Sequence, residues 1–175
     1  MDLSVDLLPR RRVATIENAW TGAAEVEAGR QVPVRVFLRP YRGARVEREF
    51  SVTIPPGLAA GEYRILLSDA DTLNRLQGGA SGRANAFMDL DGAISLINQE
   101  RANNKLYVSL LCAAPTVYYD DKIMPSIPGS VLNVMQSGRI AGRSFAATRE
   151  TVLEQAAIPF DFVLSGGYSL TITVK

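Results

Sequence analysis

The sequence predicts a mainly β protein with some helix: an antiparallel immunoglobulin-like β-sandwich built from both ends of the chain. Two runs of alternating apolar and polar residues flank a Pro/Gly turn at 40–43, which is typical of a hairpin with one buried face. Short strand-like segments with turn residues between them also precede this hairpin and close the chain. Helical spacing is confined to the middle, as an insertion around 70–102 and a short helix around 128–137.

The central hairpin has one apolar face, formed by Val32, Val34, Val36, Leu38, Val46, Phe50, Val52 and Ile54. Arg35 and Arg39 share the other face with Glu47 and Glu49, so we expect ion pairs across the strands. Arg48 has the parity of the apolar face. Either a bulge redirects Arg48, or its stem lies along the core edge with the charge outside.

The remaining strands are predicted on the same grounds at 3–7, 13–20, 25–30, 62–67, 106–112, 151–157, 158–164 and 168–174. Trp20 is expected in the core. The apolar run 106–112 is continuous, which favours a strand buried on both faces. It ends at Cys112, which we expect to be buried and chemically quiet.

Helix boundaries follow from capping residues. Asp69 or Asp71 is placed to cap a short helix, and Asp89 or Asp91 a second one over 87–101. Pro128 suits the first turn of a third helix. The apolar side of that helix would be formed by Val131, Leu132 and Met135.

These elements predict a single domain over 1–175, with the sandwich formed by 1–68 and 149–175 and an α/β insertion at 69–148. The first residues run almost directly into strand-like sequence, so we expect a piece of a longer protein. The chain has no stretch of about 18 apolar residues, and we expect no membrane insertion. A net charge of +1 gives no electrostatic reason to expect a nucleic-acid partner.

No catalytic, cofactor-binding or metal-binding residue is predicted. The chain has no histidine and one cysteine, which removes Ser-His-Asp triads, Cys-His pairs and the common zinc sites. Neither phosphate-binding glycine motif occurs. Asp89 and Asp91 resemble the opening of a calcium loop, but the ligand spacing is missing, and helix capping is the interpretation.

A protein-interaction surface is the remaining candidate site. Tyrosine is favoured at interfaces, and two tyrosines lie beside charged residues in one run and a third in the hairpin turn. The candidate residues are Tyr118, Tyr119, Asp120, Asp121, Tyr41 and Arg42. The alternative for 118–121 is a polar connection with one tyrosine against the core.

Several segments, in order, carry a resemblance to a known family: ATIENAW, VPVRVFLRPYRG, IPPG followed by GEYRILLSDADTLNR, NNKLYVSLL, MPSIPGSVLNVM and FVLSGGYSLTITVK. Together they resemble the C-terminal β-rich region of bacterial SpoIVB-type serine peptidase-domain proteins, from about Val13 onward. The family's catalytic residues belong to the peptidase domain, which no segment here matches, so none is carried over. Gly129 stands where a second proline is expected, and the loop 78–82 has no counterpart.

The resemblance implies a non-catalytic accessory domain, which would pack on or position a peptidase domain of the same parent chain. It also implies an extracytoplasmic location, periplasmic or secreted. Two alternatives stay open. One is a carbohydrate- or protein-binding β-sandwich module. The other is a carboxylate- or metal-dependent hydrolase, for which the candidate side chains are Asp89, Asp91, Asp120 and Asp121.

Overall fold

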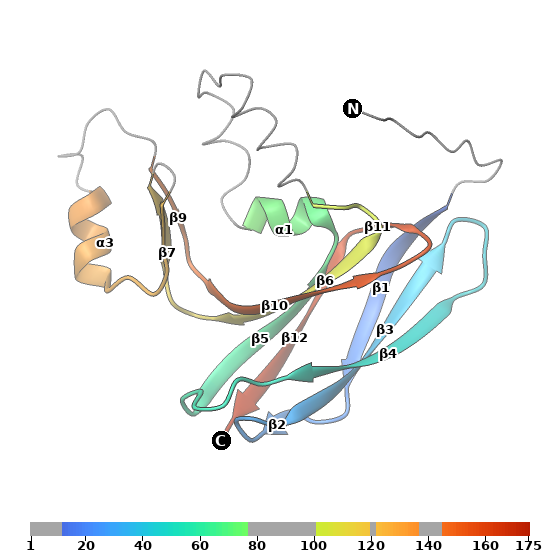
Figure 1. Cartoon of the computed structure of the whole chain (residues 1–175), viewed down its shortest axis with the longest axis horizontal. Helices are drawn as coiled ribbons and strands as arrows, with labels where there is room; N and C mark the ends of the chain where they lie inside the picture. The colour runs from blue at the N-terminus through green and yellow to red at the C-terminus, as the bar shows by residue number, and fades with distance from the viewer. Residues whose placement is uncertain (1–11, 77–100, 120–121, 137–144) are drawn as a thin grey trace, which may run out of the picture.

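The computed structural model describes residues 12–76, 101–119, 122–136 and 145–175, and these form a β-rich protein with three sheets (Figure 1). In spatial order, sheet A consists of β11 (Val163–Ser165), β1 (Val13–Thr21), β3 (Gln31–Pro40) and β4 (Val46–Thr53). Sheet B consists of β10 (Thr151–Pro159), β6 (Lys105–Cys112), β5 (Gly61–Ser68), β12 (Gly167–Val174) and β2 (Glu25–Val26). Sheet C consists of β8 (Lys122–Met124), β7 (Thr116–Tyr119) and β9 (Phe145–Thr148). The expected elements at 3–7 and 87–101 lie outside the described residues.

Sheets A and B form a sandwich-like pair around one shared core, which confirms the β-rich prediction. Sheet A contributes Ala14, Ile16, Val32, Val34, Val36, Leu38 and Leu164 to this core, and sheet B contributes Ile65, Leu67, Leu106, Val108, Leu110, Ile172 and Val174. Strands from both ends of the chain build it. One strand comes from the middle: β6 pairs with β5 and β10 inside sheet B, although the sequence placed it within the insertion. Its run of six buried residues suits that central position.

The β3–β4 hairpin forms as predicted. Its register is unbroken from Gln31 opposite Thr53 to Leu38 opposite Val46. The inward residues of β3 are almost completely buried, at 0–1% exposure. The unbroken register excludes a bulge at Arg48, so its stem lies along the edge of the core with the charge outside.

Strand β1 corrects the prediction for Trp20, whose side chain is 56% exposed rather than in the core. The pairing of β1 with β3 shifts between Ile16 and Asn18. Ala14 and Ile16 point inward before this bulge, and Ala19 points inward after it. Because the extra residue reverses the parity of the strand, Trp20 faces solvent on the outer side of sheet A.

Helix α1 (Ala70–Leu76) packs against sheet B through Leu73, which contacts Tyr107 in a small apolar cluster. Its cap is Asp69: Oδ1 accepts a hydrogen bond from the Thr72 backbone N–H at 2.6 Å. Oδ2 accepts another from the Gly166 N–H at 2.7 Å. A single buried carboxylate therefore fixes both the start of α1 and the turn between β11 and β12.

Helix α3 (Gly129–Gln136) begins just after Pro128, as expected. Its predicted apolar side is only partly correct. Val131 is 46% exposed, whereas Leu132 and Met135 are half-buried. The spacing of apolar residues in a helix this short does not show how much of its apolar side is buried by the rest of the protein.

Two further expectations are corrected at the C-terminal strands and at the thiol. The predicted break at 157–158 does not occur, because β10 follows β6 along its whole length as far as Pro159. The break falls at 160–162, where the Phe160 N–H donates to the Asn104 carbonyl at 2.8 Å. Cys112 is half-buried rather than buried, because it is the last residue of β6, where the strand leaves the sheet.

Candidate interaction surface

The structure places the predicted interaction residues in two separate regions. Tyr41 and Arg42 form the β3–β4 turn, with the Arg42 guanidinium 5.2 Å from the Tyr41 ring centroid. Tyr118 and Tyr119 lie in β7 of sheet C, at the opposite side of the view in Figure 1. Asp120 and Asp121 lie outside the described residues. The described tyrosines therefore do not form one surface.

The outer side of sheet A carries a different cluster, which we call the Trp20 face. Its members come from β1, β3, β4 and the turn before β4: Glu17, Trp20, Arg35, Phe37, Arg39, Arg45, Glu47 and Glu49. Trp20, Arg35 and Glu49 are direct neighbours across three strands. The Arg35 guanidinium lies 5.9 Å from the centroid of the indole, within the range of a cation–π contact.

The outer edge of the indole lies close to Gly22, in the turn that follows β1. A Cβ on Gly22 would lie 3.6 Å from the outer edge of the ring and 3.7 Å from the Pro33 side chain. The ring therefore rests over the turn that follows β1. More than half of the Trp20 side chain stays accessible, so a partner could cover a large, pre-oriented apolar area.

The positively and negatively charged side chains of the Trp20 face form ion pairs with one another. Arg35 pairs with Glu47 at 2.8 Å and with Glu49 at 2.9 Å. The hydrogen bond that Arg35 donates to Glu49, followed by the charge of Glu47, raises the pKa of Arg35 above its ordinary value. The face thus holds fixed charges of both signs beside the aromatic ring.

Glu17 forms the remaining ion pairs of the Trp20 face. It accepts a hydrogen bond from Arg39 at 2.6 Å and forms an ion pair with Arg45 at 3.1 Å. The pairing expected between Arg39 and the glutamates of β4 is replaced by this one, because β1 lies beside β3 and carries Glu17 on its outer side, as alternation from Ala14 and Ile16 predicts. Arg45 also lies 4.0 Å from the Phe37 ring centroid. Glu17 therefore links β1 to the hairpin across the outer surface.

Sequence reasoning missed Trp20 as a surface residue, although one signal was present. Uninterrupted alternation from Ala14 and Ile16 would place Asn18 and Trp20 inward. A buried asparagine needs hydrogen-bond partners that a strand face seldom supplies. A polar residue at an expected core position therefore indicates a bulge, and Asn18 is exposed in the structure.

Within the described ranges, no group of three or more His, Cys, Asp or Glu residues is placed to hold a metal ion. No helix in the same ranges is both long enough and apolar enough to cross a membrane. Comparisons with protein-family models, with curated proteins and with solved structures gave no match for this chain. The physical character of the Trp20 face is thus the basis for a functional proposal.

Proposed function

We propose that this chain is a non-catalytic interaction domain that binds a protein partner through the Trp20 face. The observation that carries the proposal is the exposed indole of Trp20, held against Arg35 on a flat sheet surface. Tryptophan, tyrosine and arginine dominate the energetics of protein interfaces. Trp20 is 56% exposed, so its indole offers a large area that a partner could bury.

The partner we propose is a peptidase domain of the same parent protein, in an extracytoplasmic compartment. Its support is the resemblance of the segments from about Val13 onward to the SpoIVB-type proteins. The ordered charges of both signs on the Trp20 face favour a partner surface with a complementary arrangement of charges. The domain would then position or stabilise the peptidase part.

The direct test is a pull-down and a thermal melt of the separately expressed peptidase part, with and without this domain. The expected result is binding and a raised Tm of the peptidase part. Trp20→Ala should abolish both effects, whereas Val134→Ala, which truncates an exposed side chain of α3, should leave them unchanged. Binding that survives Trp20→Ala would contradict the role of the Trp20 face, and no binding by the wild-type chain would contradict the partner.

A second candidate function is carbohydrate binding, which the same indole favours because an exposed flat aromatic ring can stack on a sugar. Trp20 is the chain's one tryptophan, so its fluorescence reports on this surface directly. A titration with a panel of soluble polysaccharides separates the two candidates. A saturable change in emission with a sugar, and none with the peptidase part, would favour the carbohydrate-binding function.

We also propose that the chain alone catalyses nothing. A serine nucleophile needs a base, and the sequence has no histidine. A lysine base would need an apolar setting that lowers its pKa, whereas Lys175 is exposed and ion-paired to Glu25. Assays for peptidase, esterase and glycosidase turnover should stay at background. Turnover that Asp120→Asn or Lys105→Met abolishes in a folded protein would support the hydrolase alternative instead.

The sandwich itself we propose to be immunoglobulin-like. In support, both sheets are mainly antiparallel, and the chain crosses between them after β1, β2, β4, β10 and β11. The parallel pairing of β1 with β11 closes one edge of sheet A. A crystal structure with a different strand order in these two sheets would overturn this assignment.

A further inference from the structure

Strand β4 is the outermost strand of sheet A, and its second backbone edge has no strand neighbour among the described residues. Its eight residues span about 27 Å at roughly 3.4 Å per residue. Each alternate backbone N–H and C=O on that edge is available to another strand. The edge is thus long enough to pair with an extended peptide segment.

The inner face of β4 is also incompletely covered. Val46, Phe50 and Val52 are half-buried, whereas their partners on β3, Leu38, Val34 and Val32, are 0–1% exposed. The apolar core therefore continues under β4 but stays open at its rim. A further strand beside β4 would cover these side chains.

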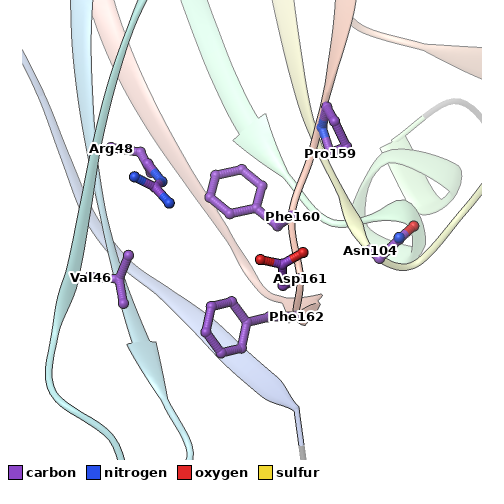
Figure 2. A pocket seen from close by; sticks show the side chains of 7 residues that line it. All are labelled: Val46, Arg48, Asn104, Pro159, Phe160, Asp161 and Phe162. Carbon is purple, nitrogen blue, oxygen red and sulfur yellow. The ribbon is translucent and has the colours of Figure 1, made fainter.

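A pocket of about 310 Å³ opens at this rim. Val46 and Arg48 of β4 line one wall, and Phe160 and Phe162, from the segment after β10, face them from the other wall (Figure 2). The hydrogen bond from the Phe160 N–H to the Asn104 carbonyl anchors this segment. The pocket is large enough for one or two apolar side chains.

Arg48 is the positively charged residue of the pocket lining, and Asp161 is the negatively charged one. The other arginines of the hairpin strands, Arg35 and Arg39, have glutamate partners, but the Arg48 guanidinium forms no ion pair or hydrogen bond with any residue that the structure describes. Its chain neighbours Glu47 and Glu49 point to the opposite face of the sheet and bind Arg35. The guanidinium therefore lies unpaired beside a recess that has both apolar and polar lining residues.

A charged side chain on the inner side of an edge strand, even with its charge exposed at the rim, discourages indiscriminate pairing, and here it makes the edge selective. A second copy of this chain paired at β4 would bring another Arg48 to the same inner face, and like charges disfavour that arrangement. A segment with a carboxylate at the matching position gains a charge-assisted hydrogen bond instead. Asp161 on the far wall disfavours an acid placed there, so the carboxylate belongs on the β4 side.

We propose that the β4 edge binds an extended acidic–apolar segment of a partner protein as an added strand. An apolar side chain of that segment enters the pocket against Phe160 and Phe162, and an acidic side chain pairs with Arg48. The backbone of the segment bonds to β4, which is a known mode of peptide recognition. This site is separate from the Trp20 face, which lies on the other side of sheet A.

Selection of random octapeptides by phage display on the whole chain tests the proposal. The expected consensus has apolar residues at alternate positions and an Asp or Glu in the same alternating set. On the Arg48→Glu variant the acid should be replaced by Lys or Arg, and on the control Arg149→Glu it should remain. No alternating consensus, or the same acid selected by the Arg48→Glu protein, would overturn the proposal. Circular dichroism verifies folding, and Arg48→Gln, which should lose the acidic preference, serves if Arg48→Glu unfolds.

Backbone methylation of the selected peptide tests strand addition itself. N-methyl groups on the edge facing β4 should weaken binding at least about tenfold, because hydrogen bonds are lost, while those on the other edge should have little effect. Equal effects on both edges would contradict strand pairing. If N-acetylphenylalanine binds as tightly as the peptide, the pocket is a small-molecule site instead. If the chain forms a dimer that the selected peptide dissociates, the occupant of the β4 edge is a second copy of the chain.

Discussion

The inner and outer faces of sheet A are formed by the same strands but differ in chemical character. The inner face of β3 is sealed, with Val34, Val36 and Leu38 at 0% exposure. The outer face of the same strand carries Arg35, whose charge is fixed by Glu47 and Glu49 beside an accessible Trp20. The buried core is therefore on one side of the sheet, and the binding surface that we propose is on the other. Substitutions on the two faces should consequently separate folding from binding.

The largest expected effect is on the inner face. Val36→Asp places a charge at the centre of the sealed core, where it has no partner, and should lower the free energy of unfolding by more than about 4 kcal/mol. Circular dichroism during chemical denaturation measures this loss. Wild-type behaviour of the variant would mean that the assignment of the two faces is reversed.

A smaller effect distinguishes the sealed and open parts of the inner face. Val34→Ala on β3 should cost about 2 kcal/mol, because a completely buried side chain is truncated. Val52→Ala on β4 should cost less than about 1 kcal/mol, since Val52 is only half-buried. Equal losses in matched denaturation curves would show that β4 is covered, which would also weaken the proposal for its edge.

The outer face should tolerate truncation. Arg35→Ala should change the stability only slightly, because exposed ion pairs contribute little, and added salt should reduce the difference further. The raised pKa of Arg35 means that its contribution is present at every pH below its unfolded value and is lost only as pH rises through the higher folded value. Melts between about pH 5 and 9 should therefore show no titration of Arg35. A collapse of Arg35→Ala would place this residue in the structural core of the fold.

The comparison of faces also shows how far the sequence could predict the molecule. Alternation placed the inner residues of β3 correctly, because the hairpin register has no interruption. The same reasoning was wrong for Trp20, because one bulged residue in β1 reverses every later side chain. Bulges arise from the fit between neighbouring strands, which local periodicity does not encode.

The prediction was also limited where strands that are far apart in the sequence pair with one another. The apolar run of β6 indicated a buried strand, but its place between β5 and β10 depends on contacts across much of the chain. The pairing of Glu17 with Arg39 likewise depends on which strand lies beside β3. The candidate surface at Tyr41 and Arg42 came from residue type alone, and the structure places it apart from Tyr118 and Tyr119.

The most direct test of the central claim is the fluorescence of Trp20, the chain's one tryptophan. In the free domain its emission should be that of a partly solvated indole, and acrylamide should quench it readily, because the side chain is 56% exposed. Saturating amounts of the peptidase part should shift the emission to shorter wavelength and protect it from the quencher. An indole already shielded in the free domain, or one that stays equally accessible when the peptidase part is bound, would contradict the account.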